Sequence, residues 1–209
     1  GELCRECLPR GLVNIVHGFG QAAGDPLVRH PLVRRIGFTG SVPTGLAIQR
    51  AAAESGVKLV TLELGGKNPF IVFPDADLGR AVEMAVAGMN FAWAGQSCGS
   101  TSRLLLHESV HDEFVERYAA RLRALQLGDP LDPASEMGPV NSRRQHERVL
   151  GFFASARDEG ARLVTGGRRP PGAAFERGYW VEPTLYADVT PAMRVAREEV
   201  FGPIVCAMR

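Results

Sequence analysis

The sequence predicts an α/β fold. Short runs of β-forming residues alternate along the chain with stretches of helical spacing, which is typical of βαβ units and a parallel sheet. Of the 209 residues, 45% are hydrophobic and 22% are charged, the proportions of a globular chain that buries a core.

The first third of the chain predicts strands and helices in turn. Strands are expected over residues 12–16, 35–38 and 58–64, and helices over residues 21–28 and 43–55. Ser41 or Val42 lies near the start of the second helix, with Pro43 in its first turn. Gly56 ends that helix.

The rest of the chain continues the alternation. Strands are expected over residues 69–73, 102–106 and 162–164, and helices over 78–93, 109–126 and part of 139–159. Asp75 and Ser109 are the expected N-caps of the helices that follow them. The Gly-, Pro- and Arg-rich residues 166–178 predict a loop.

Charge and cysteine content exclude several classes of protein. The 24 basic and 23 acidic residues leave +1, so no nucleic acid or membrane partner is expected. The most apolar window, residues 84–95, is too short to span a bilayer. The 4 cysteines fit a reducing compartment, and we expect the cytoplasm. Cys4 and Cys7 form a lone CxxC, better explained by a shared helix face than by zinc.

Residues His107 to His111 match HExxH, a zinc-hydrolase pattern that requires one continuous helix. Here a predicted strand runs into His107, and the following helix starts near Ser109. The two imidazoles are therefore expected to point apart, and no metal site is predicted.

Two glycine-rich turns follow predicted strands. Residues 18–24 nearly fit GxGxxG, with one residue too many before the last glycine, but the signal is weak because glycines after strands usually form plain turns. Residues 40–45 join a strand to a helix, whose free N–H groups and positive dipole end could hold a phosphate. A strand-to-helix turn with a serine cap explains residues 40–45 equally well.

Glu63 and Cys98 are the candidate catalytic residues. Glu63 ends a strand among apolar neighbours and glycines, where a carboxylate could have a raised pKa and act as a general base. Cys98 follows a helix and has small neighbours that leave room for a substrate. Taken alone, each has an ordinary alternative: a solvated acid and a buried small hydrophobe.

Taken together, four segments resemble the aldehyde dehydrogenase superfamily, in its order and with similar separations. They are Phe38-Thr39-Gly40-Ser41, residues 62–67 (LELGGK), residues 95–98 (GQSC) and residues 199–203 (EVFGP). The resemblance covers essentially the whole chain. It implies a partial Rossmann-like cofactor domain over residues 1–65 and a partial catalytic domain over residues 66–209.

The resemblance also implies roles for individual residues. Cys98 corresponds to the nucleophile and Glu63 to the base that activates water, so the product is expected to be a carboxylic acid. The residues expected to line the NAD or NADP site are Gly20, Phe38, Gly40, Ser41, Gly45, Leu64, Gly65, Glu199 and Phe201. Ser100 departs from the Ala or Gly common in the family but is still small.

The resemblance further implies a central slice of a longer enzyme that oxidises a small-molecule aldehyde and forms a homo-oligomer. The family's oxyanion-hole Asn would then precede Gly1. Two alternatives stay open: an inactive remnant that only binds a nucleotide or a partner, and a zinc hydrolase using His107 and His111.

Overall fold

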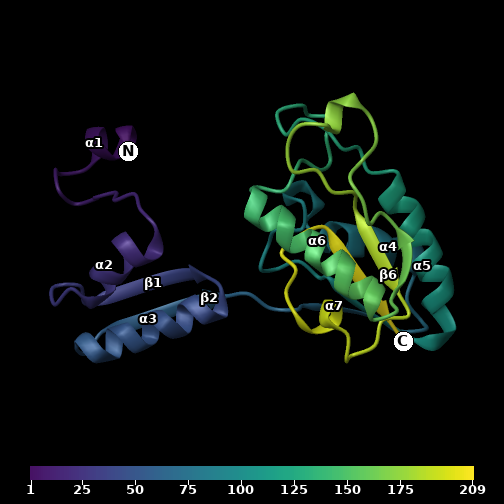
Figure 1. The fold of residues 1–209 in the computed structure, drawn as a ribbon, viewed down its shortest axis with the longest axis horizontal. Coiled ribbons are helices and arrows are strands. Elements are labelled where there is room, and N and C mark those ends of the chain that lie inside the picture. The colour runs from purple at the N-terminus through teal and green to yellow at the C-terminus, as the bar shows by residue number, and fades with distance from the viewer. The chain divides into compact units, whose positions relative to one another are not determined.

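The structure, a computed structural model, describes residues 1–209. The chain folds into two compact units, residues 1–65 and residues 66–209, each described on its own (Figure 1). The elements of the first unit are α1 (Glu2–Cys7), the π-helix η1 (Gly20–Gly24), α2 (Asp25–Arg29), β1 (Arg35–Gly40), α3 (Val42–Ser55) and β2 (Leu59–Leu64).

A βαβ unit forms the centre of the first unit, as the sequence predicts. β1 and β2 pair in parallel, from Arg35 opposite Leu59 to Gly40 opposite Leu64. Helix α3 makes the connection, and its Ala51 and Ala52 are buried against the strands and α2. Since both strands end at the same edge, Gly40 and Leu64 place the residues that follow them side by side.

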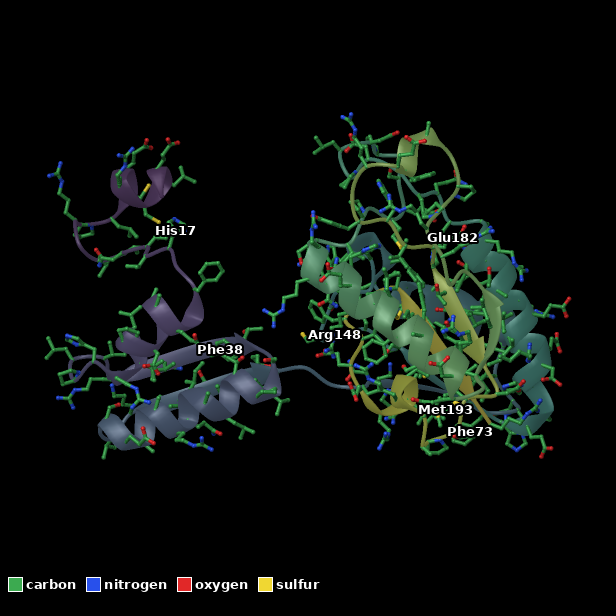
Figure 2. The ribbon with its side chains drawn as sticks, viewed as in Figure 1. His17, Phe38, Phe73, Arg148, Glu182 and Met193 are labelled. Carbon is green, nitrogen blue, oxygen red and sulfur yellow. The ribbon has the colours of Figure 1, made fainter.

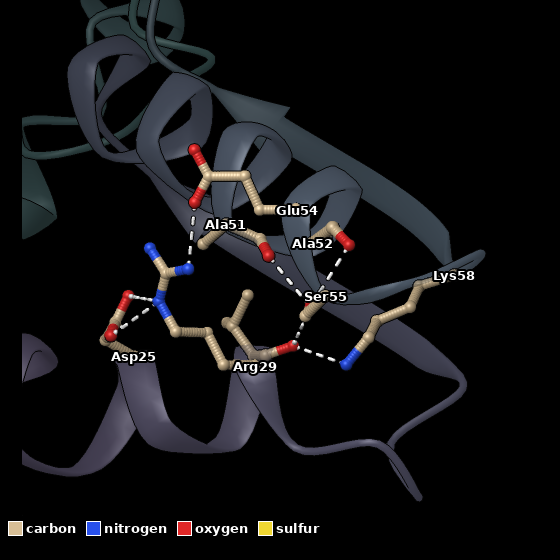
Figure 3. A network of polar contacts seen from close by, with 8 residues as sticks. Asp25, Arg29, Ala51, Ala52, Glu54, Ser55 and Lys58 are labelled. Atoms are coloured by element: carbon tan, nitrogen blue, oxygen red, sulfur yellow. Dashed lines mark hydrogen bonds and ion pairs between the residues drawn. The ribbon is translucent and has the colours of Figure 1, made fainter.

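Polar contacts fasten α2 to α3 (Figure 3). Arg29 donates to Asp25 on its own helix and to Glu54 on α3, at 3.0 and 2.9 Å. Lys58 Nζ donates to the carbonyl oxygens of Val28 and His30, at 2.6 and 2.7 Å. These bonds satisfy the end of α2, so the short helix has a fixed place on the βαβ unit.

The strand predicted over residues 12–16 is wrong. These residues are irregular and exposed, and no strand of the chain pairs with them. β-propensity alone does not make a strand, because a strand needs a partner for its backbone groups.

The second unit is built on one sheet. Its elements are β3 (Pro69–Val72), α4 (Leu78–Gly88), the 3₁₀ turn η2 (Phe91–Trp93), β4 (Arg103–Leu106), α5 (Glu108–Arg123), α6 (Arg143–Asp158), β5 (Arg162–Thr165), the 3₁₀ turn η3 (Ala173–Phe175), β6 (Thr184–Ala187), α7 (Arg194–Arg197) and β7 (Ile204–Met208). The strand order is β3-β4-β7-β6-β5. All neighbouring strands pair in parallel except β5 and β6, which are antiparallel.

Helices cover both faces of this sheet (Figure 1). Val205 and Ala207 of β7 belong to the core under α4 and α5. Ile204, Cys206 and Met208 alternate with them and belong to the core under α6 and α7. The central strand is thus buried on both sides, which explains the continuous apolar run at residues 204–208.

Several helix boundaries differ from the predictions. The helix after β3 ends at Gly88 rather than residue 93, because Asn90 takes a left-handed conformation that a helix cannot contain. Its N-cap is Asp77 rather than Asp75, accepting from the Arg80 N–H at 3.1 Å. For α5 the cap is His107 rather than Ser109. None of the helices is long and apolar enough to cross a membrane.

Candidate active site

The first unit gathers most of the predicted cofactor residues at the carboxyl edge of β1 and β2. Gly40 and Leu64 are partners at the last position of the two strands, and Ser41 and Gly65 follow them. Ligands of open α/β sheets bind outside the carboxyl ends of the strands. Glu63 lies in the same edge, opposite Thr39, with an exposed side chain.

The start of α3 has the properties of an anion site. Ser41 is the N-cap by position, but its hydroxyl pairs with the Thr44 hydroxyl at 2.9 Å and caps no backbone N–H. In the first turn of this 14-residue helix, Pro43 has no N–H, and the N–H groups of Val42 and Thr44 are free for a ligand. This favours the phosphate interpretation over a turn closed by its own serine.

Two glycines let the backbone approach its neighbours closely. A Cβ on Gly45 would lie 2.8 Å from Leu64 Cδ2, so a larger residue there would displace the Leu64 side chain at the end of β2. A Cβ on Gly40 would lie 2.5 Å from the ring of Phe38, which is on β1 (Figure 2). Phe38, Gly40, Gly45 and Leu64 thus form one contact group, whereas Gly20 begins η1, which packs on α2.

In the second unit, Cys98 lies on a turn between η2 and β4 that several hydrogen bonds hold. The Gly99 N–H donates to Ser97 Oγ at 3.2 Å, and the Ser100 N–H donates to the Ser97 carbonyl at 3.1 Å. Ser100 Oγ is buried and donates to the carbonyls of Met89 and Gly95. The serine that departs from the family pattern therefore anchors the turn.

Asn68 holds the Cys98 residue itself. Its amide donates to the Cys98 carbonyl oxygen at 2.6 Å, from the entrance of β3 thirty residues earlier. The Cys98 N–H donates to no group of the chain, which leaves it for an oxyanion. Sequence reasoning missed Asn68, because no local pattern marks a contact across such a separation.

Exposure separates Cys98 from the other cysteine of this unit. Cys98 is a free, exposed thiol, whereas Cys206 lies in the buried strand β7. Burial raises the pKa of the Cys206 thiol, so it stays protonated and unreactive. Burial also lowers the pKa of Lys67, which follows the glycine pair and whose Nζ has no hydrogen-bond partner.

Glu199 and Phe201 lie on the loop between α7 and β7, both half-buried. Glu199 Oε1 accepts from the Gly66 N–H at 3.3 Å, which links the carboxylate to the segment after Gly65. Phe201 has φ +56°, a left-handed conformation that is unusual for a large side chain. The next residue, Gly202, contacts Gly95, so the loop and the Cys98 turn lie against each other.

Gly95 makes this close contact possible, and we expect Gly95→Ala to destabilise the second unit. Its φ is +68°, and an added Cβ would lie 2.4 Å from the Gly202 carbonyl oxygen. Backbone strain and overpacking together predict a loss of about 2–4 kcal/mol in the free energy of unfolding. Urea unfolding of the full-length protein measures it.

Gly151→Ala is the matched control, because an added Cβ at Gly151 in α6 meets nothing within 4 Å. The control is expected to keep or slightly raise the stability. Equal unfolding midpoints for the two variants would contradict the close contact at Gly95.

The two histidines of the HExxH match lie in different surroundings. His107 Nδ1 accepts from the Ser109 N–H at 3.3 Å, and its side chain is exposed. His111 is fully buried in α5, where Nδ1 contacts Asp112 at 2.8 Å. This hydrogen bond holds the pKa of the Asp112 carboxyl below its usual range. No group of three or more His, Cys, Asp or Glu side chains is placed to hold a metal ion.

Comparison with known proteins gives one consistent result. The sequence model of the aldehyde dehydrogenase family matches residues 1–209. The chain is 50% identical over 212 residues to aldehyde dehydrogenase tropH of Talaromyces stipitatus, covering 100% of this chain and 41% of that protein. The chain thus spans about two fifths of the length of this relative.

Two solved structures carry the same fold together with a cofactor. The betaine aldehyde dehydrogenase of Staphylococcus aureus in complex with NAD+ superposes with a TM-score of 0.95 at 38% identity, covering 99% of this chain and 41% of that one. A 3,6-anhydro-L-galactose dehydrogenase in complex with NADP gives 0.92 at 42% identity, covering 96% and 42%. The fold, the ordered motifs and the match over the full length agree, and the chain belongs to the aldehyde dehydrogenase family.

Proposed function

We propose that this chain supplies the catalytic cysteine, the general base and much of the cofactor site of an enzyme that oxidises an aldehyde to a carboxylic acid. The observation that carries the proposal is the Cys98 turn. It presents an exposed thiol and an unused N–H on a backbone fixed by Asn68 and Ser100, in a chain of this family.

In the first half-reaction, the Cys98 thiolate adds to the aldehyde carbon and forms a thiohemiacetal. The negative charge moves to the former carbonyl oxygen, where the Cys98 N–H is one donor that can stabilise it. The carbon then loses a hydride and becomes a thioester on Cys98. A bound nicotinamide dinucleotide, when oxidised, accepts that hydride.

In the second half-reaction, Glu63 takes a proton from water as the water attacks the thioester carbon. The carbon–sulfur bond breaks, the carboxylic acid leaves, and the Cys98 thiolate is restored. A carboxylate at a strand end beside Leu64 and Gly65 suits a base that meets water, because its side chain is exposed. Family members that pass the acyl group to coenzyme A generally lack this Glu, so Glu63 favours hydrolysis.

The residues present fit a dinucleotide. The free N–H groups at the start of α3, with Gly40 and Ser41, would hold the pyrophosphate, while Gly45 lets the helix approach the sheet. Leu64 and Gly65 would border the nicotinamide. Glu199 would accept from the ribose hydroxyls, with Phe201 packed beside it. Gly20 would line the pyrophosphate site together with Gly40 and Ser41.

The full-length protein tests this proposal directly. It is expected to form NADH or NADPH from the oxidised cofactor and an aldehyde, with one acid released for each hydride transferred. Binding of a cofactor without any oxidation of an aldehyde would favour the nucleotide-binding remnant instead. The substrate is a small-molecule aldehyde, and we expect the enzyme to act as a homo-oligomer. We also propose that the enzyme acts in a reducing compartment, the cytoplasm.

Removal of metal separates this proposal from the zinc hydrolase. Dialysis against a chelator is expected to leave aldehyde oxidation unchanged, because His107 caps the start of α5 and His111 is buried within that helix. Activity and bound zinc are measured before and after dialysis. One zinc per chain, lost together with activity and also lost in His107→Ala, would contradict the cysteine mechanism.

A further inference from the structure

Helix α6 holds the backbone of the loop that carries Glu199. We infer that Gln145 is a positioning residue for cofactor binding: it fixes the loop so that the Glu199 carboxylate stands where the cofactor ribose needs it. The inference rests on the proposed function, in which Glu199 contacts that ribose.

Two side chains of α6, one turn apart, hold three successive carbonyl groups. Gln145 Nε2 donates to the carbonyl oxygens of Val200 and Phe201, at 2.9 and 2.7 Å. Arg148 (Figure 2) donates to the Glu199 carbonyl oxygen at 2.7 Å. Both hydrogens of the Gln145 amide are therefore donated to this loop. Their acceptors lie 55 and 56 positions after Gln145 in the sequence.

The loop needs such support because its backbone is in an unfavourable conformation. Phe201 has φ +56°, which a large side chain adopts only when its surroundings impose it. Gly202 lies so close to α6 that an added Cβ would be 2.5 Å from Val149 Cγ2. Val149 is fully buried, so the loop packs directly on the buried face of α6, and the Gln145 hydrogen bonds hold it there.

The Glu199 side chain has little support of its own. Its carboxylate accepts one long hydrogen bond, from the Gly66 N–H at 3.3 Å, and the residue is half-buried. Its position is therefore set mainly by its backbone. A change at Gln145 should reach the cofactor through Glu199 and not by direct contact.

The test compares Gln145→Met with Glu147→Met in the full-length protein. Methionine keeps the length of Gln145 and removes both donors, whereas Glu147 is an exposed residue of the same helix. The dissociation constants for NAD+ and NADP+ are measured by titration. Gln145→Met is expected to weaken binding about tenfold, the effect of one or two hydrogen bonds. Glu147→Met should not change binding.

A double-mutant cycle with Glu199→Gln distinguishes positioning from general damage. If Gln145 acts through Glu199, then Gln145→Met has little further effect in the Glu199→Gln background. Additive losses in the double variant would overturn the inference. If Gln145→Met does not fold, Gln145→Leu replaces it, because leucine has a similar volume, carries no charge and also lacks the donors.

The outcomes separate this inference from the proposed function. If Glu199→Gln weakens cofactor binding and Gln145→Met does not, the positioning role is overturned and the proposed function stands. If the unaltered protein binds neither NAD+ nor NADP+, the proposed function is overturned, and the positioning role with it.

Discussion

Cys98→Ala is expected to abolish aldehyde oxidation. Without the sulfur there is no thiohemiacetal from which a hydride can leave, so the rate should fall by on the order of 10⁴-fold or more. The measurement is the formation of NADH or NADPH by the full-length protein at saturating aldehyde. Cofactor binding should persist, because the residues expected to hold the cofactor are not altered.

The matched control is Cys7→Ala, which makes the same change at another exposed, free cysteine. It is expected to keep full activity, since Cys7 is on α1 and has no part in the proposed chemistry. Undiminished turnover in Cys98→Ala, or equal losses in the two variants, would contradict a nucleophilic role for Cys98.

Glu63→Gln is expected to separate the two half-reactions. Glutamine keeps the size of the side chain and removes its ability to take a proton, so acylation should continue while hydrolysis slows by about 10²- to 10⁴-fold. Rapid mixing should show a burst of reduced cofactor followed by a slow steady state. A general loss of folding would instead remove the burst as well.

Glu116→Gln serves as the control for this variant, because Glu116 is an exposed carboxylate on α5. Its steady-state rate should match that of the unaltered protein. A normal steady-state release of acid by Glu63→Gln would show that another group activates the water.

Local sequence signals were sufficient to predict the elements of the βαβ unit. Pro43 and Gly56 mark the ends of α3, and alternation and β-branching mark β1 and β2, because these signals act within a few residues. The predicted strand at residues 12–16 shows the limit: its composition is right, but a strand exists only where another backbone pairs with it.

The candidate site was predictable only in part, for a physical reason. Cys98, Glu63 and the glycines stand in short motifs, from which the resemblance assigns their expected roles. Asn68 and Gln145 act through contacts 30 and 55 residues away, which only the packed sheet and α6 bring about. The left-handed conformation of Phe201 was likewise invisible, since a residue of this type rarely adopts it.

The exposed carboxylate of Glu63 also differs from the environment that the sequence suggested. Apolar neighbours in the sequence predicted a shielded acid, but alternate residues of β2 face opposite sides. Leu62 and Leu64 therefore turn inward while Glu63 turns out to solvent. Residues that are adjacent in a strand therefore have side chains in different surroundings, because their side chains lie on opposite faces of the sheet.

The central claim is that the aldehyde carbon becomes a thioester on Cys98, and the most direct test is to trap it. Glu63→Gln is mixed with an aldehyde and oxidised cofactor, quenched in acid, digested and analysed by mass spectrometry. The account predicts one acyl group on the peptide that contains Cys98, formed only when the oxidised cofactor is present. An acyl group on another residue, or oxidation of the aldehyde with no covalent adduct, would contradict it.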